Sequence, residues 1–136
     1  MTDVHDASPL TALVVDDDAM LRMDVVAMLE DAGFLTLDAE DVDSALSVLG
    51  RHHATIALLF SDVDMPGTRD GFGLAREVAA RWPGITVVIA SGRRRPGPGD
   101  LPDGVCFIAK PFSAELVHGH LREIMPEHRR PAKLKD

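Results

Sequence analysis

The sequence predicts an α/β fold in which helices cover both faces of a parallel sheet. Five short apolar segments recur along the chain, and four of them lack the polar alternation of a half-exposed strand. Strands that are buried on both faces of a parallel sheet have this composition. Helical patterns separate most of these segments, and such alternation is typical of parallel sheets with helical crossovers.

The apolar segments give the positions of the five predicted strands. They are residues 10–15, 34–37, 56–60, 85–90 and 105–108. The second segment is the weakest of the five, so we expect it near an edge of the sheet.

Four stripes of apolar residues at helical spacing predict the helices. The stripes run over residues 21–32, 42–49, 74–82 and 116–124, and a glycine or a proline closely follows each of them. Ser113 is the predicted N-cap of the last helix. Residues 91–104 contain three prolines and four glycines, so we expect this segment to be loop-like in place of a regular fourth helix.

The composition is that of one soluble globular domain, with 136 residues, 46% hydrophobic and 26% charged. We expect this domain to cover residues 10–125, between a flexible N-terminus at 1–9 and a flexible basic tail at 126–136. Cys106 is the single cysteine, which excludes an internal disulfide and a cysteine-based zinc site. The apolar runs are too short to span a membrane and residues 1–9 lack the features of a signal peptide, so we expect a cytoplasmic protein.

Charge is unevenly distributed along the chain. The formal net charge is −8, and residues 1–50 carry twelve acidic residues against a single base, Arg22. Nucleic-acid binding depends on the neutralisation of phosphates, so the acidic surplus argues against DNA binding. The chain also lacks a P-loop motif, which argues against a nucleotide site of that type.

Polar residues follow four of the predicted strands, at the point where each strand ends. Asp16 and Asp17 follow the first strand, Asp62 the third, Ser91 the fourth and Lys110 the fifth. Ligands of open parallel sheets bind just outside the carboxyl ends of the strands. We therefore expect these side chains to meet at one binding site.

The residue types at this site fit phosphoryl-transfer chemistry. Three carboxylates at close range repel one another, and a hard divalent cation such as Mg²⁺ removes that conflict. Lys110 and Ser91 offer a positive charge and a hydroxyl donor to phosphoryl oxygens. One carboxylate is then a candidate nucleophile that forms an acyl phosphate while the metal and Lys110 offset charge.

The residues around these strand ends resemble the receiver domain of two-component response regulators. The matching segments are LVVDDD at 13–18, SDVDMP at 61–66, VVIASG at 87–92 and AKPF at 109–112. The resemblance covers residues 10–125. It implies a flavodoxin-like, doubly wound fold with five parallel strands in the order 2-1-3-4-5.

The resemblance also implies a role for each acidic residue. Asp62 is the phosphoacceptor, and it receives a phosphoryl group from a histidine kinase or a phosphotransfer protein. Asp17, Asp62 and the backbone carbonyl of Asp64 bind Mg²⁺ directly, and Asp16 binds it through water. Only eleven residues follow Met125, too few to fold as an output domain, so we expect a stand-alone receiver, a signalling phosphoacceptor rather than an enzyme. It passes its signal to a partner of unknown identity or relays the phosphoryl group.

The remaining implied roles concern the switch. Ser91 and Lys110 contact the phosphoryl group, and Phe107 is the aromatic residue that turns inward when Ser91 moves. The Lys110–Pro111 peptide bond is expected to be cis. Asp64 is acidic where many family members have asparagine, and we hypothesise that Arg93 reaches it and restricts the attacking water.

Two other functions remain open at this point. The Asp62-Val63-Asp64 segment looks like the nucleophile motif of haloacid-dehalogenase-type phosphatases. In those enzymes, however, the paired acids come later in the chain than the nucleophile, whereas Asp16 and Asp17 come first here. The second alternative is a receiver-like interaction module that is never phosphorylated.

Overall fold

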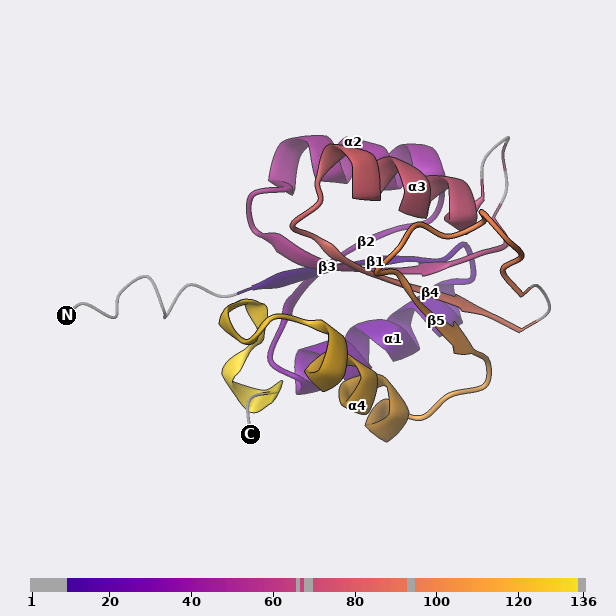
Figure 1. Cartoon of the computed structure of the whole chain (residues 1–136). Helices are drawn as coiled ribbons and strands as arrows, with labels where there is room; N and C mark the ends of the chain where they lie inside the picture. Colours follow the sequence, from indigo (N-terminus) through magenta and orange to yellow (C-terminus); the bar gives the residue numbers. More distant parts are fainter. Residues whose placement is uncertain (1–9, 66, 68–69, 93–94, 135–136) are drawn as a thin grey trace.

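The computed structural model describes residues 10–65, 67, 70–92 and 95–134, and it has three layers with a parallel sheet in the middle (Figure 1). The strands are β1 (Thr11–Val15), β2 (Leu35–Ala39), β3 (Ile56–Asp62), β4 (Thr86–Ser91) and β5 (Cys106–Ala109). The helices are α1 (Ala19–Asp31), α2 (Val42–His52), α3 (Gly71–Arg81) and α4 (Ala114–Ile124), followed by the 3₁₀ turns η2 (Glu127–Arg129) and η3 (Ala132–Leu134).

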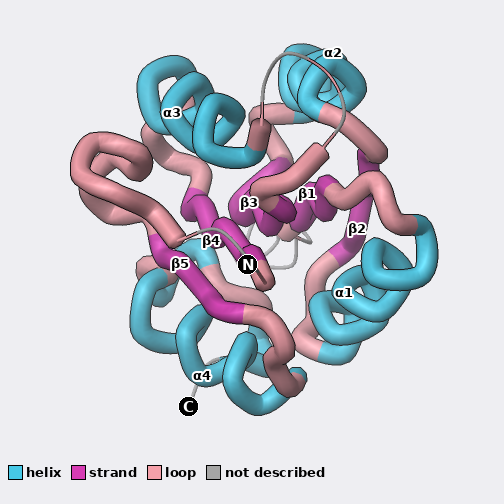
Figure 2. The backbone as a smooth tube through the Cα atoms, turned by 90° about the vertical axis from the view of Figure 1, so that its right-hand side faces the viewer, coloured by secondary structure: helices cyan, strands magenta, loops and turns pink. Residues whose placement is uncertain are grey.

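All pairs of neighbouring strands are parallel, and the strand order is β2-β1-β3-β4-β5, as predicted. β2 is an edge strand, which confirms the expectation for the weakest apolar segment. In the register, Val15 of β1 lies beside Ser61 of β3, and Asp62 lies beside Ala90 of β4. The carboxyl ends of these three strands therefore meet at one edge of the sheet (Figure 2).

Two apolar cores lie on opposite faces of the sheet. Helices α1 and α4 cover one face, and α2 and α3 cover the other (Figure 1). Along β1, Ala12 and Val14 belong to the first core and Leu13 and Val15 to the second, because successive side chains of a strand point to opposite faces. Burial on both faces explains why this strand is apolar at every position.

Each α-helix begins at a short polar residue whose side chain accepts hydrogen bonds from the first turn. These N-caps are Asp18, Asp41, Asp70 and Ser113. Such a cap contributes about 1 kcal/mol to helix stability. The prediction for Ser113 is confirmed, and Asp18 fixes the start of α1 directly beside the ends of β1 and β3.

The crossover segment, residues 92–105 between β4 and β5, contains no helix in its described part, residues 92 and 95–105, as the prolines and glycines predict. A turn at Asp100 holds it, because the carboxylate accepts from Gly97 N at 2.7 Å and the carbonyl accepts from Arg76 Nη1 at 2.9 Å. Leu101 and Val105 pack against the core under α2 and α3. None of the described helices is long and apolar enough to cross a membrane.

The expectation of a flexible tail from residue 126 onward is wrong for the C-terminal segment, residues 126–134. Leu134 is 1% exposed and belongs to the core under α1 and α4. Arg129 Nη2 donates to the carbonyl of Ile56 at 3.1 Å, and Arg130 Nε donates to the carbonyl of Met125 at 2.8 Å. The two arginine side chains thus bond to backbone carbonyls of the folded domain. These bonds hold the segment in place although its composition is polar and basic.

Candidate functional site

Three carboxylates meet at the carboxyl edge of the sheet. Asp16 and Asp17 directly follow β1, and Asp62 is the last residue of β3. Oxygen atoms of the three side chains lie within 4.8 Å of one another, and we call these residues the carboxylate cluster. Asp16 is 5% exposed, Asp62 is partly buried and Asp17 is exposed. The structure therefore brings together the acidic residues that the sequence singled out.

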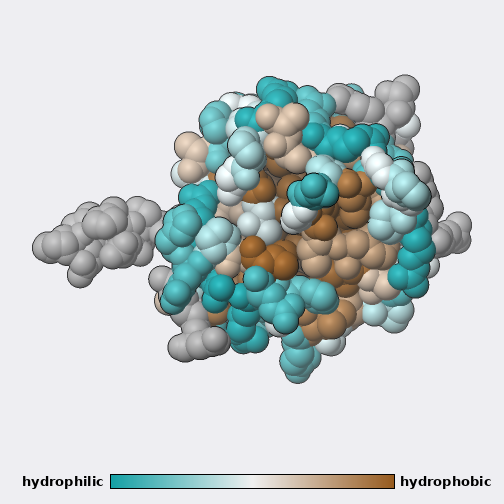
Figure 3. Space-filling model, viewed as in Figure 1, coloured by the Kyte–Doolittle hydropathy of each residue, from teal (hydrophilic) through white to brown (hydrophobic). Residues whose placement is uncertain are grey.

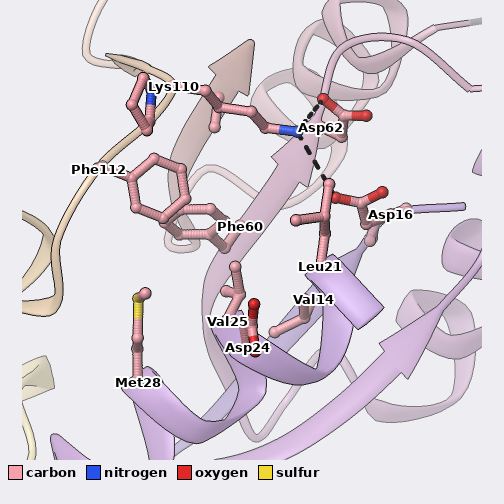
Figure 4. A pocket seen from close by; sticks show the side chains of 13 residues that line it. Val14, Asp16, Leu21, Asp24, Val25, Met28, Phe60, Asp62, Lys110 and Phe112 are labelled. Carbon is pink, nitrogen blue, oxygen red and sulfur yellow. Dashed lines mark hydrogen bonds and ion pairs between the residues drawn. The ribbon is translucent and has the colours of Figure 1, made fainter. Parts of the chain in front are cut away.

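Lys110 directly follows the carboxyl end of β5 and contacts this cluster. Its Nζ donates to Asp62 Oδ1 at 3.1 Å and lies 3.8 Å from Asp16 Oδ2 (Figure 4). The peptide bond between Lys110 and Pro111 is cis, as the resemblance implied. One ammonium group thus faces two of the three carboxylates, and the cluster retains an excess of negative charge.

Burial has the largest effect on the pKa values of Asp16 and Asp62. It raises the pKa of Asp62 and the pKa of Asp16, because burial removes water that would stabilise the charged carboxylates. The hydrogen bond from Lys110 opposes the effect at Asp62, and a backbone N–H of Asp18, 2.9 Å from Asp16 Oδ1, opposes it at Asp16. The charge of Asp62 raises the pKa of Asp16 further.

The donor set of the cluster fits a hard divalent cation. Mg²⁺ prefers carboxylate and carbonyl oxygens, and it offsets the excess negative charge that Lys110 leaves. Among the described residues, this is the one group of three or more acidic, histidine or cysteine side chains close enough to hold an ion. Asp64 lines the same surface hollow as the cluster, together with Gly92 and Lys110.

Ser91 and Phe107 lie near this hollow but do not line it. Ser91 ends β4 and is 2% exposed, and its carbonyl accepts from the backbone N–H of Lys110 at 3.0 Å. Phe107 lies in β5 with its ring against the core under α2 and α3, and the guanidinium carbon of Arg95 is 5.8 Å from the ring centre. Arg93, which we expected to reach Asp64, is outside the described residues.

Arg22 is a part of the site that the sequence analysis missed. From α1 its Nη1 donates to the backbone carbonyl of Asp16 at 2.7 Å, and its Nε donates to Asp38 Oδ2 at 2.8 Å. The signal in the sequence was a lone base among twelve acids, one helical turn after the N-cap Asp18. Arg22 entered the charge balance above, but no contact with the site was expected of it.

Gly71 is the second missed residue. Its backbone N–H donates to the carbonyl of Val63 at 2.8 Å, and a Cβ atom at this position would collide with the backbone carbonyl of Asp62. The N-terminus of α3 therefore packs directly on the backbone that carries the Asp62 side chain. Only glycine permits this approach.

The fold and the site define a doubly wound α/β domain with an acidic site at the carboxyl edge of its sheet. The family model of the response regulator receiver domain matches residues 12–122. The match covers most of the chain, and the chain therefore belongs to the response regulator receiver family. Aspartate phosphorylation and Mg²⁺ binding are general features of this family in two-component systems. The haloacid-dehalogenase alternative receives no support from this assignment.

Curated relatives agree with the family assignment. The transcriptional regulatory protein PdtaR of Mycobacterium tuberculosis is 30% identical over 137 residues, covering 90% of this chain and 63% of the relative. The C4-dicarboxylate transport transcriptional regulatory protein DctD of Rhizobium meliloti is 34% identical over 115 residues, covering 79% of this chain and 23% of the relative. The chain thus spans less than two thirds of the length of either protein.

Solved receiver structures share the fold. The receiver domain of the hybrid histidine kinase CckA is 28% identical, with a TM-score of 0.72, over 85% of this chain and 99% of that one. A response regulator receiver protein from Sinorhizobium medicae is 24% identical, with a TM-score of 0.75, over 88% and 97% of the two chains. The second comparison shows the fold alone.

Proposed function

We propose that Asp62 accepts a phosphoryl group from a histidine kinase or a histidine phosphotransfer protein in a Mg²⁺-dependent reaction. The observation that carries this proposal is the carboxylate cluster with Lys110 bonded to Asp62 at its centre. The position of Asp62 supports it further, because this residue ends a central strand and faces a hollow open to solvent.

In the proposed reaction an Asp62 carboxylate oxygen attacks phosphorus. The new O–P bond forms while the N–P bond of the donor phosphohistidine breaks, and the imidazole nitrogen keeps the bonding electron pair. Asp17, Asp62 and the Asp64 backbone carbonyl, with Asp16 through water, would hold Mg²⁺, which would offset the charge of the phosphoryl oxygens. Lys110, 3.1 Å from Asp62 Oδ1, then exchanges that contact for one with the phosphoryl group.

We also propose that Ser91 and Phe107 form the switch. Ser91 ends the strand beside Asp62, so a small movement brings its hydroxyl to the phosphoryl group. Phe107 lies one strand further out, in β5, where it is half-buried and packs against the core under α2 and α3. The phosphoryl group on Asp62 is a new dianion. It then shifts the equilibrium between two arrangements of β4, the crossover segment and β5.

The partners and the setting follow from this role. We propose a cytoplasmic receiver, a phosphoacceptor rather than an enzyme, that contacts a downstream protein or relays its phosphoryl group. The described part of the chain contains the receiver fold and the C-terminal segment packed on it, and no DNA-binding domain. An interaction module that is never phosphorylated is the competing function.

Intact-mass spectrometry tests the proposal. The wild type, Asp62→Asn and the control Asp103→Asn, an exposed acid away from the cluster, are incubated with acetyl phosphate, with and without Mg²⁺. We expect one phosphoryl group on the wild type and on the control, only with Mg²⁺, and none on Asp62→Asn. No adduct and no donor consumption would indicate the interaction module instead. Continuous donor hydrolysis without an adduct would indicate a phosphatase.

A further inference from the structure

A cavity of about 210 Å³ lies between α1 and the connection from β5 to α4, next to the carboxylate cluster (Figure 4). Its floor is formed by side chains of three central strands, and its rim by Leu21 and Asp24 of α1 on one side and by Phe112 on the other.

The inner part of the cavity is apolar. Val14, Phe60 and Ala90 of the strands are at most 3% exposed, and Val25 and Met28 of α1 complete the wall. A buried apolar cavity of about 150 Å³ stays dry and binds benzene. The volume here therefore fits one six-membered ring with a short side chain, held between the α1 side chains and the paired rings of Phe60 and Phe112, whose centres are 5.7 Å apart.

The polar atoms around the cavity favour a positively charged ligand. Asp16 and Asp62 line the end of the cavity next to the carboxylate cluster, together with Lys110, which is already bonded to Asp62 at 3.1 Å. Asp24 is exposed on the rim and forms no ion pair with any residue that the structure describes. Three carboxylates thus surround the cavity against one ammonium group, and an anionic ligand is repelled.

We propose that this cavity is a binding site for a small organic cation, a single hydrocarbon ring that carries a short alkylammonium group. The ring fills the space between Val25, Met28 and Phe112, and the ammonium group lies at Asp24. This site extends beyond the metal site and shares Asp16, Asp62 and Lys110 with it. Occupancy and Mg²⁺ binding are therefore coupled, and each ligand changes the affinity of the other by the same factor.

Titration of the whole chain with 2-phenylethylamine, followed by the methyl NMR signal of Met28, tests the proposal. The measurement uses no Mg²⁺ and no phosphodonor, so its outcome is independent of the phosphorylation assay. Phenylacetate, with the opposite charge, and ethylamine, without the ring, are the matched probes. We expect saturable binding of 2-phenylethylamine and binding of either control that is weaker by about tenfold or more.

Two kinds of variant locate the ligand. Asp24→Asn is expected to weaken binding by about threefold, whereas Asp31→Asn, an exposed acid at the other end of α1, leaves it unchanged. Val25→Phe fills the cavity and is expected to abolish binding. Leu21→Trp covers the mouth from an exposed position, so it gives the same result even if the core variant fails to fold.

Three results would overturn the proposal. The first is an unshifted Met28 signal up to the solubility of the amine. The second is equal binding of 2-phenylethylamine and phenylacetate, which would remove the charge argument. The third is undiminished binding to Leu21→Trp, which would place the amine elsewhere on the protein.

Discussion

The guanidinium of Arg22 donates to the backbone carbonyl of Asp16 at 2.7 Å, so a side chain of α1 fixes the backbone at the end of β1. The same guanidinium donates to Asp38 in β2 at 2.8 Å, and the Arg22 side chain is only 16% exposed. Two hydrogen bonds to acceptors at the end of β1 and in β2 restrict the guanidinium to one orientation. The position of the Asp16 and Asp17 carboxylates therefore depends on a residue that does not itself belong to the carboxylate cluster.

Replacement of Arg22 tests this dependence. We expect Arg22→Ala to weaken Mg²⁺ binding by about tenfold, the effect typical of lost outer hydrogen bonds around a metal site. Arg22→Lys restores one bond and part of the affinity. Calorimetric Mg²⁺ titration is the measurement, and Arg81→Ala, which removes an exposed pair with Glu77 on α3, is the control. Equal Mg²⁺ affinity of Arg22→Ala and Arg81→Ala would contradict the positioning role.

The raised pKa values of Asp16 and Asp62 predict how stability depends on pH without metal. A carboxyl with a raised pKa in the folded state binds more protons there than in the unfolded chain, so its contribution favours folding at low pH. That contribution is lost as the pH rises from the ordinary value through the raised pKa. We expect the free energy of unfolding in urea with EDTA to fall over this window, and the fall to be smaller in Asp62→Asn.

Mg²⁺ should reverse this loss of stability above the raised pKa. A ligand at 100 times its Kd stabilises the folded state by about 2.7 kcal/mol, and the gain requires the ionised cluster. Repeating the urea titrations with Mg²⁺ checks this, with Ca²⁺-free buffer and Asp103→Asn as the reference. A stabilisation of Asp62→Asn as large as that of the wild type would show that the ion binds elsewhere.

Gly71 and Gly50 give opposite predictions for the same substitution. Gly71→Ala places a Cβ against the backbone carbonyl of Asp62, and overpacking of this kind costs about 1–3 kcal/mol. Gly50 lies inside α2 with nothing within 4 Å of a Cβ, so Gly50→Ala is expected to stabilise by about 0.5–1 kcal/mol. Thermal and urea unfolding measure both. A neutral Gly71→Ala would mean that α3 can move away from Asp62 at little cost.

A fifth prediction concerns the C-terminal segment. Leu134→Ala removes a side chain that is 1% exposed, and such truncations cost about 2–5 kcal/mol. Lys133→Ala, next to it and exposed, should change stability by less than about 0.5 kcal/mol. Urea unfolding of the two variants separates a packed segment from a loose one, because a loose segment would give two equally small effects.

The strands and the carboxylate cluster were predictable because they depend on topology. A run of apolar residues predicts a buried strand, and parallel strands bring Asp16 and Asp62 to the same edge whatever the details of side-chain packing. The helix-free crossover segment was predictable for a similar local reason, since Pro96, Pro98 and Pro102 disfavour a helix in any tertiary setting. The strand order itself came from the resemblance.

The features that could not be predicted from the sequence depend on contacts between distant segments. The bonds of Arg22 depend on which side of α1 faces β1 and β2, and apolar periodicity does not fix the direction of a polar side chain. Burial of Leu134 depends on a surface that exists only after the sheet has formed. Gly33 has a φ of +104°, and a Cβ atom here would lie 2.9 Å from Pro131 Cβ, so the packing of the C-terminal segment depends on glycine at a distant position.

The contacts of the C-terminal segment also determine on which side of the molecule residue 134 lies. Arg129 bonds to the first residue of β3, and Pro131 packs on Gly33 just before β2, so this segment lies at the amino edge of the sheet. The carboxylate cluster lies at the opposite edge. A fluorophore, an affinity tag or a surface tether joined beyond residue 134 would therefore start from the side away from Asp62. An immobilised sample prepared in this way would leave the carboxylate cluster open to a partner protein in solution.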